Sequence, residues 1–366
     1  MHYNWQLPDW ANFTYDDTVI DPLITEFALE TGELKGLLAA QPADIQQDTI
    51  LQFMITEALK TSEIEGEFFS RQDIMSSLKK QLGIADNINY IKDKKSQGIA
   101  ALLVNARKSF QDKLTELALK SWHHDLMKGN AYINAGVYRT GKEPMQIISG
   151  AFGKEVGHFE APPSNEVAGE MKKFVKWYNN FETSGNDIRN IFIKTSISHL
   201  YFESIHPFED GNGRIGRAVA EKCLSQSLGR PVLMSLSSTI EKDRKKYYNA
   251  LKYAQRTLDV TEWILYFSKV ILESQKNAKH VVLFTIGKAK FLDTHKHQLN
   301  ERQLKAIMKM FDVGIAKFEG GMTSQKYVSI TKASRATATR DLQDLVYKHI
   351  LIQKGEGRSV RYDLNM

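Results

Sequence analysis

Residues 206–217 spell HPFEDGNGRIGR, and an ordinary connecting loop needs no such combination of a histidine, acids, glycines and arginines. Pro207 disfavours the α region for the residue before it, so the preceding helix should end at His206. Gly211 and Gly213 permit positive φ and a tight turn. A second helix is predicted from about Arg214. The stretch therefore predicts two helices joined by a loop that presents His206 to a cleft.

The residue types of this loop indicate phosphate chemistry. A glycine-rich turn before a helix N-terminus directs backbone N–H groups and a positive dipole at one place. Arg214 and Arg217 are three residues apart, so both can bind phosphate oxygens. Asp210 is a hard oxygen ligand suited to a Mg²⁺ that travels with phosphates, and His206 can take a proton from an attacking hydroxyl. These residues predict metal-assisted phosphoryl-type transfer; the alternative is a structural turn with surface arginines.

The rest of the sequence predicts a mostly α fold. Helical spacing of apolar residues dominates, for example over 48–69, where Asp48 is a candidate N-cap, and over 261–310. Strand-like patterns are confined to residues 143–150 and the last twenty residues. Three regions are predicted: a helical N-terminal region (1–100), a central helical domain (101–275), and a linker helix with a C-terminal domain (276–366).

Composition limits the setting and the partners. Cys223 is the one cysteine, so no intrachain disulfide is expected and a cytoplasmic location fits. The N-terminus lacks the pattern of a signal peptide, and no apolar run is long enough to cross a membrane. The net charge of +6 arises entirely in residues 295–366, which hold 13 Lys/Arg and 7 Asp/Glu. Any contact with nucleic acid is therefore expected in this segment.

Residues 206–217 match the signature HPFx[DE]GNGRxxR, and the chain thereby resembles the Fic family. The resemblance implies a helical Fic domain that transfers AMP from ATP to a hydroxyl side chain of a target protein, called AMPylation. It makes His206 the general base and Asp210 the Mg²⁺ ligand. The residues that it assigns to ATP are Gly211, Asn212, Gly213, Arg214, Ile215, Gly216, Arg217, Tyr247, Tyr248 and Gln255. For the tyrosine pair, ordinary packing is the alternative.

Two further segments follow the family pattern. GVYRTGKEPMQIISG and HFEAPP resemble its flap, a β-hairpin that aligns the target segment by main-chain pairing. The flap residues are Ile147, Ile148, Ser149 and Gly150. TSEIEG, residues 61–66, resembles the inhibitory motif [ST]xxxE[GN], which implies that Glu65 pairs with Arg217 and misaligns ATP. The alternative is that Glu65 is a solvated helix residue.

The C-terminal segment resembles the winged helix-turn-helix domains of many Fic proteins. A helix from about Arg335 is followed by a predicted hairpin, with Arg358 and Arg361 along it. DNA binding and protein docking are left as alternatives. Two functions therefore stand: a self-inhibited AMP transferase, or a DNA-binding regulator whose Fic site senses nucleotide, transfers a related phosphate group or removes AMP. The target protein and a homodimer cannot be inferred from the sequence.

Overall fold

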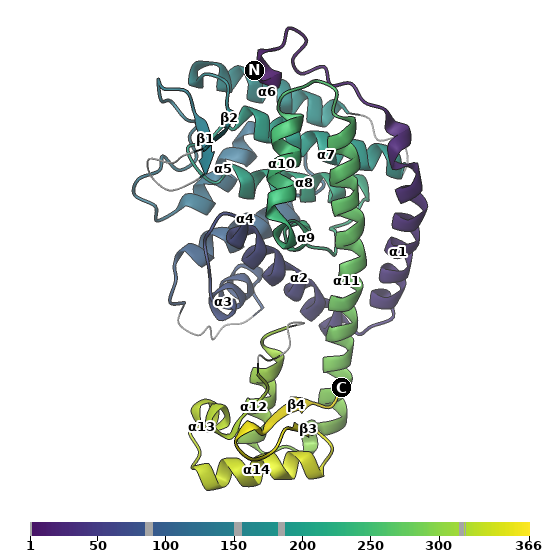
Figure 1. Ribbon diagram of the computed structural model, residues 1–366, viewed down its shortest axis with the longest axis vertical. Coiled ribbons are helices and arrows are strands. Elements are labelled where there is room, and N and C mark those ends of the chain that lie inside the picture. Colours follow the sequence, from purple (N-terminus) through teal and green to yellow (C-terminus); the bar gives the residue numbers. More distant parts are fainter. Residues whose placement is uncertain (1, 85–90, 150–155, 182–186, 315–317, 319) are drawn as a thin grey trace. The chain divides into compact units, whose positions relative to one another are not determined.

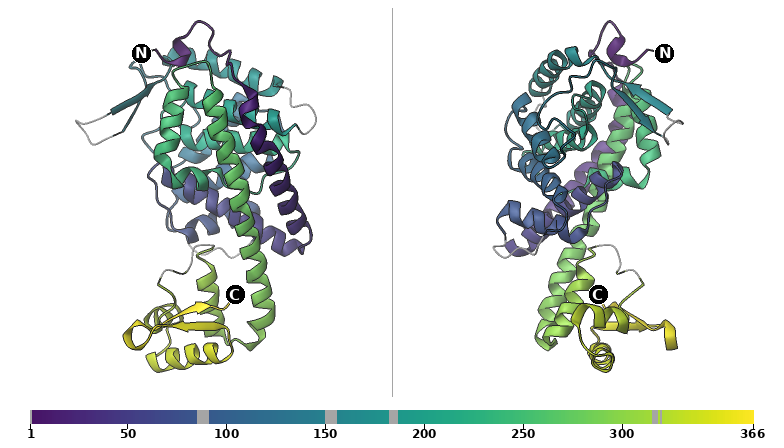
Figure 2. Two further views of the ribbon diagram at one scale, coloured as in Figure 1. Left: turned by 45° about the vertical axis from the view of Figure 1, so that its right-hand side comes forward. Right: turned by 90° about the vertical axis from the view of Figure 1, so that its left-hand side faces the viewer.

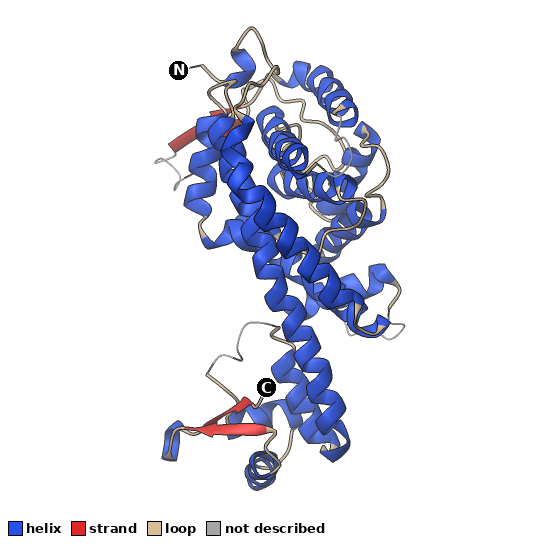
Figure 3. Cartoon of the chain, turned by 90° about the vertical axis from the view of Figure 1, so that its right-hand side faces the viewer, coloured by secondary structure: helices blue, strands red, loops and turns tan. Residues whose placement is uncertain are grey.

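The computed structural model describes residues 2–84, 91–149, 156–181, 187–314, 318 and 320–366. Helices dominate, and the described strands form two short antiparallel pairs (Figure 3). The predicted α-rich fold is thus confirmed. In this part of the chain no helix combines the length and the apolar character that crossing a bilayer requires.

The chain divides into two compact units, Met1–Glu33 with Phe53–Ala278, and Leu34–Gln52 with Lys279–Met366. The division falls inside three long helices, which are α1 (Asp21–Ala39), α2 (Ala43–Ile64) and α11 (Thr261–His295). The three regions expected from the sequence differ in their boundaries from these two units, and the division into three domains stays a prediction.

The first unit contains the loop of residues 206–217. Its other helices (Figure 1) are α3 (Arg71–Leu82), α4 (Lys95–Lys108), α5 (Glu116–Met127), α6 (Ser164–Asn180), α7 (Ile188–Ile205), α8 (Asn212–Ser227), α9 (Leu236–Lys242) and α10 (Arg244–Ala254). Two 3₁₀ turns, η1 (Asn4–Gln6) and η2 (Asp17–Ile20), precede α1.

Helix α7 is the centre of this unit. Every residue from Ile191 to Ile205 is buried, and α6 and α8 pack against the helix. A helix that is covered on all sides needs internal partners for its polar side chains. Ser196 and Ser198 accordingly donate to carbonyls one turn earlier in α7. Because α7 is fixed on every face, the loop at its C-terminal end starts from a rigid support.

The strands β1 (Gln146–Ser149) and β2 (Val156–Glu160) form an antiparallel hairpin that projects from the helices of the first unit (Figure 2). Gln146 pairs with Glu160, and the register shifts between Ile147 and Ile148. The predicted strand near 143–150 is confirmed. The N-terminal segment supports the base of this hairpin, because Nε1 of Trp5 donates to the carbonyl of Glu160 (2.7 Å).

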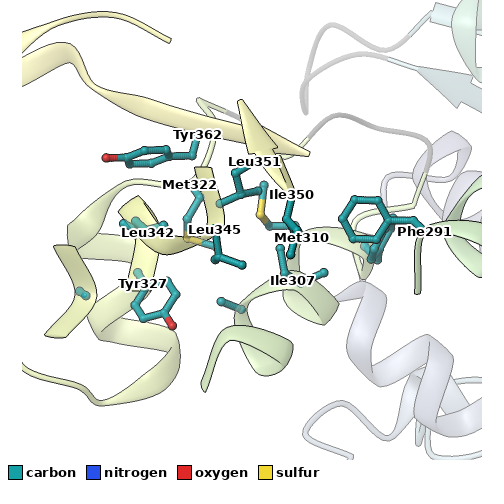
Figure 4. Close-up of a cluster of buried hydrophobic side chains, with 13 residues drawn as sticks. Phe291, Ile307, Met310, Met322, Tyr327, Leu342, Leu345, Ile350, Leu351 and Tyr362 are labelled. Atoms are coloured by element: carbon teal, nitrogen blue, oxygen red, sulfur yellow. The ribbon is translucent and has the colours of Figure 1, made fainter. Parts of the chain in front are cut away.

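The second unit contains α12 (Glu301–Phe311), α13 (Ser324–Thr331), α14 (Arg335–Tyr347) and the antiparallel strands β3 (Leu351–Lys354) and β4 (Arg361–Leu364). Two 3₁₀ turns, η3 (Lys296–Gln298) and η4 (Gly357–Ser359), complete it. Its core (Figure 4) includes Ile307, Met310, Tyr327, Leu342 and Leu345. The predicted start of α14 and the predicted hairpin are confirmed.

The N-cap predicted for α2 is wrong. The helix begins at Ala43, directly after Pro42, and Asp48 lies inside it. No breaker separates Pro42 from Asp48, and proline is well tolerated at a helix start, so the helix extends back to it. The carboxylate of Asp48 pairs instead with Lys288 (2.7 Å).

Candidate active site

His206 follows α7 directly, and backbone contacts hold it on both sides. Its φ and ψ are 49° and 61°, the left-handed conformation that turns the chain out of the helix. Its N–H donates to the carbonyl of Phe202 (3.0 Å), and its own carbonyl accepts from Nε of Arg139 (2.8 Å). The imidazole is largely buried and lines a cavity of about 580 Å³. The predicted helix end at His206 is confirmed.

Helix α8 begins at Asn212, slightly before the predicted start, and its first turn forms one wall of this cavity. Gly211 has a φ of 78°, which residues with a Cβ rarely adopt, so glycine is favoured there; an added Cβ would also lie 2.4 Å from Cε of Met127. The side chain of Asn212 closes the loop, because it accepts from the N–H of Phe208 and donates to the carbonyl of the same residue. The N-terminus of α8 offers N–H groups and a positive dipole, which suit an anion.

Arg217 lies one turn into α8, and α2 holds its guanidinium. Nη2 lies 2.7 Å from Oε1 of Glu65 and also donates to the carbonyl of Thr61, while Nε donates to Oγ1 of Thr61 (2.8 Å). Among the described residues, Nη1 has no acceptor. Burial lowers the pKa of Arg217, but Glu65, Tyr247 and Tyr248 together raise it more, so the pKa lies above its usual value. The carboxylate of Glu65 also lies against Gly213, where an added Cβ would be 2.2 Å from Oε1.

Arg214 pairs with a different carboxylate and does not line the cavity that contains His206. Its Nη1 hydrogen-bonds to Oε2 of Glu67, and its Nη2 lies 3.5 Å from Oδ1 of Asp210. These three residues and Lys95 line a smaller neighbouring cavity. The two arginines of the signature therefore contact different acids, although helical spacing places them on one face.

Asp210 lies at the edge of the larger cavity with half of its side chain exposed. Its Oδ1 accepts from the N–H of Gly211 (2.5 Å). Within the described residues, no group of three or more His, Cys, Asp or Glu side chains could hold a metal by itself. A Mg²⁺ that binds with phosphates needs only one or two carboxylates from the protein. Asp210 fits that role.

Helix α10 brings Tyr247, Tyr248 and Gln255 to the same cavity. The hydroxyl of Tyr247 lies 2.9 Å from Nε2 of His199, and the residue is buried. Tyr248 is 40% exposed, and its ring lies beside that of Tyr247. Gln255 is buried, and its Nε2 donates to the carbonyl of Glu203 (3.3 Å). Tyr248 is thus the more accessible of the two tyrosines.

Comparisons with known proteins match the part of the chain that contains this loop. Residues 113–224 match the Fic/DOC family. The chain is a Fic family protein. Residues 3–84 match a domain of unknown function, DUF4172. Fic structures from Desulfovibrio desulfuricans (TM-score 0.57, 18% identity, 96% of this chain and 97% of that one) and Bacteroides thetaiotaomicron (0.52, 20%, 69% and 95%) share the fold.

The curated relatives of this Fic protein carry the name protein adenylyltransferase. A probable protein adenylyltransferase of Aquifex aeolicus is 27% identical over 172 residues, 47% of this chain and 46% of the relative. Protein adenylyltransferase Fic of Drosophila melanogaster is 31% identical over 99 residues, 27% of this chain and 18% of the relative. The chain spans less than half of the length of these relatives.

The structure brings most of the predicted site residues together in this Fic domain. Glu65, His206, Asp210, Gly211, Asn212, Gly213, Arg217, Tyr247, Tyr248 and Gln255 line the larger cavity. Arg214, Ile215 and Gly216 do not. Ile215 is buried, and its N–H donates to the carbonyl of Gly211. In the hairpin, Ile147, Ile148 and Ser149 belong to β1, whereas Gly150 lies outside the described residues. Phe159 of β2, which sequence reasoning did not select, also lines the cavity.

Arg139 is a second residue of the Fic domain that sequence reasoning missed. Its buried guanidinium donates to the carbonyls of Ile205, His206 and Pro162 and to Oγ of Ser164. Burial lowers its pKa to about 10. The two carbonyls at the end of α7 carry the negative end of the helix dipole, which a cation stabilises. Arg139 therefore fixes the backbone of His206. It lies 67 residues from His206 in the chain, and no local pattern signals the contact.

Proposed function

We propose that this protein is a protein adenylyltransferase that transfers AMP from ATP to a Ser, Thr or Tyr hydroxyl of a target protein. The observation that carries the proposal is one cavity that combines His206, the N-terminus of α8 and Arg217. A carboxylate, that of Glu65, already occupies the anion position between Arg217 and Gly213. The site therefore suits the negatively charged phosphates of a nucleotide.

In the proposed reaction, His206 takes the proton of the target hydroxyl. The oxygen then attacks the α-phosphorus of ATP, a P–O bond to it forms, and pyrophosphate leaves with the bonding electrons. The helix N-terminus and Arg217 stabilise the charge on the phosphates. Asp210 would hold Mg²⁺, which neutralises phosphate charge when it is bound. Tyr248 offers its ring to the adenine.

We infer that Glu65 inhibits this reaction in the same molecule. Its carboxylate accepts a hydrogen bond from Arg217 (2.7 Å) and lies against the first turn of α8. A γ-phosphate cannot occupy that position at the same time. ATP that binds beside Glu65 would hold its α-phosphorus out of line for attack, and the reaction depends on such alignment.

The test is intact-protein mass spectrometry after incubation with Mg·ATP. Glu65→Gly should gain AMP, whereas Glu65→Gly with His206→Ala should not. Glu63→Ala is a matched control, because Glu63 lies two residues before Glu65, in the last turn of α2, and its carboxylate pairs with Lys60 (2.5 Å). If Glu65→Gly gains no AMP even with candidate target proteins added, the transferase proposal fails. If Glu63→Ala activates equally, the specific role of Glu65 fails. If the protein instead releases AMP from a target that already carries it, the alternative reaction, removal of AMP, is favoured.

A second candidate function, DNA binding, has its own observation. Arg335 and Arg340 on α14 and Arg361 on β4 are exposed, and no carboxylate of the described residues lies within ion-pair distance of them. Helices α12 to α14 followed by a hairpin also suit a winged helix, whose recognition helix enters the major groove.

A mobility-shift titration of the full chain at rising salt tests this candidate. Binding through phosphate contacts should weaken steeply with salt, and replacing Arg335 and Arg340 by Gln should reduce the salt slope. An affinity that ignores salt would contradict it. A cytoplasmic location remains a prediction, and whether the protein forms a homodimer stays open.

A further inference from the structure

The buried carboxylate of Glu203 is the feature of this site that the proposed chemistry does not yet use. Glu203 lies one turn before His206 in α7 and is 3% exposed. Its Oε2 lies 3.7 Å from Nδ1 of His206, which is the one basic nitrogen of the described residues within ion-pair distance. Both side chains line the larger cavity.

Burial of this carboxylate is costly for the fold. Among the described residues, Oε1 of Glu203 has no hydrogen-bond partner. A buried polar atom without a partner destabilises the folded state, because it has lost its hydrogen bonds to water. Helix α8 makes room for it with Gly216, because a Cβ there would lie 2.3 Å from Oε1. An apolar side chain would stabilise this position better, so the carboxylate indicates a functional role.

The surroundings keep Glu203 ionised. Burial raises the pKa of its carboxyl group, but His206, His199 and Arg217 together lower the pKa more, so it lies below its usual value. Other groups also face this part of the site. His199 bonds to Tyr247 of α10, and Arg217 of α8 bonds to Glu65, which directly follows α2. The carboxylate is therefore available as an acceptor at neutral pH.

His206 needs such an acceptor. A neutral imidazole that removes a proton with Nε2 must carry its own proton on Nδ1, and the group beside Nδ1 decides which nitrogen is protonated. Among the described residues, Nδ1 of His206 has no hydrogen-bond partner, and the Glu203 carboxylate is the acceptor within ion-pair distance of it. The distance of 3.7 Å must shorten by about 0.7 Å to become a hydrogen bond. Catalytic hydrogen bonds are often long in the absence of substrate and tighten in the complex.

We propose that Glu203 is a positioning residue that holds the proton on Nδ1 of His206 and so presents Nε2 to the target hydroxyl. The proton of the hydroxyl moves to Nε2, the proton on Nδ1 stays, and Glu203 stabilises the resulting imidazolium without becoming protonated. The catalytic effect of this role rests on the proposed function, whereas the tautomer of His206 can be measured without it.

The first experiment is ¹⁵N NMR of the full-length, histidine-labelled protein, with the His206 signals assigned by their loss in His206→Ala. The expected result is neutral His206 protonated at Nδ1, with a larger share protonated at Nε2 in Glu203→Gln. The unaltered chain suffices to overturn the proposal, because neutral His206 protonated mainly at Nε2 would exclude it. A tautomer that is the same in Glu203→Gln would also exclude it.

The second experiment is kinetic and uses the Glu65→Gly background. Glu203→Gln should lower kcat by roughly 10²-fold or more, since a misplaced tautomer disables a general base, while KM for ATP changes little. Glu203→Asp should recover part of the rate. Glu170→Gln is the matched control, because Glu170 is a buried carboxylate bonded to Trp10 and Lys173 outside the cavity.

The outcomes separate the two proposals. An unchanged kcat in folded Glu203→Gln would refute the role of Glu203, as would an equal loss in Glu170→Gln. If Glu65→Gly transfers no AMP at all, the proposed function fails, and the tautomer of His206 still decides whether Glu203 positions it. If Glu203→Gln does not fold, Glu203→Asp and the unaltered chain carry the test.

Discussion

Thr61→Val should activate the protein although it leaves Glu65 in place. Oγ1 of Thr61 accepts a hydrogen bond from Nε of Arg217 (2.8 Å), and both residues are only 1% exposed. Valine has a similar shape without the hydroxyl, so Nε would become a buried donor without its partner. That penalty falls only on the state in which α2 covers Arg217, because an uncovered Arg217 can bond to water or phosphate.

The size of the effect follows from the type of bond. A hydrogen bond to a charged group contributes about 1.5–3 kcal/mol. Each 1.4 kcal/mol changes an equilibrium constant tenfold, so the balance between covered and uncovered Arg217 should shift by roughly 10- to 150-fold. The gain cannot exceed that of Glu65→Gly, because the pair of Glu65 and Arg217 remains. The melting temperature should fall, since the covered state loses the same free energy.

Initial rates of labelled AMP incorporation, measured beside a thermal melt, test this prediction. Ser62→Ala is the matched control, because Ser62 is buried in the same helix and its hydroxyl donates to the carbonyl of Ala58. It should lower stability without activation. The reasoning is refuted if Thr61→Val destabilises the protein while its rate equals that of the unaltered chain and Glu65→Gly is active. It is equally refuted if Ser62→Ala activates as much.

Two further predictions concern other carboxylates. Glu67→Gln should release Arg214 from its ion pair, and a buried arginine in an ion pair is less available to phosphate. ATP should therefore bind several-fold more tightly, as measured by calorimetry. An unchanged affinity would mean that Arg214 does not reach the nucleotide. Asp341 accepts from Arg302 and Tyr327, and although burial raises the pKa of its carboxyl group, these bonds lower it below the usual value. A lowered pKa stabilises the folded form above the unfolded pKa of about 3.9, and this benefit is lost as pH falls through the folded pKa. Hydrogen exchange in α12–α14 should therefore accelerate below about pH 4. Asp341→Asn should weaken that dependence, and the part that is left belongs to Asp344, whose pKa is also lowered.

The sequence predicted those features that depend on neighbours along the chain. Pro207 disfavours helix in the residue before it, so α7 ends at His206, and Gly211 allows the turn before α8. Helical spacing likewise predicted α14, and the strand-like pattern of the last twenty residues predicted the hairpin after it. These signals act over a few residues, so they can be interpreted without knowledge of the fold. The wrong N-cap at Asp48 shows their limit, because Pro42 marks the start of α2 and no breaker separates it from Asp48.

The family signature added one long-range contact that local patterns do not contain, the pair of Glu65 and Arg217, which are 152 residues apart. The remaining contacts came from the tertiary structure alone. Arg139 reaches His206, Glu67 holds Arg214, and Glu203 becomes a buried carboxylate beside His206. Helical spacing places Glu203 near His206, but the packing of α7 against α8 at Gly216 buries its charge and gives it the energetic cost that indicates a function. Burial depends on elements distant in the chain, so the sequence named the residues of the signature, while the fold added Phe159, Arg139 and Glu203 and determined which residues act on one another.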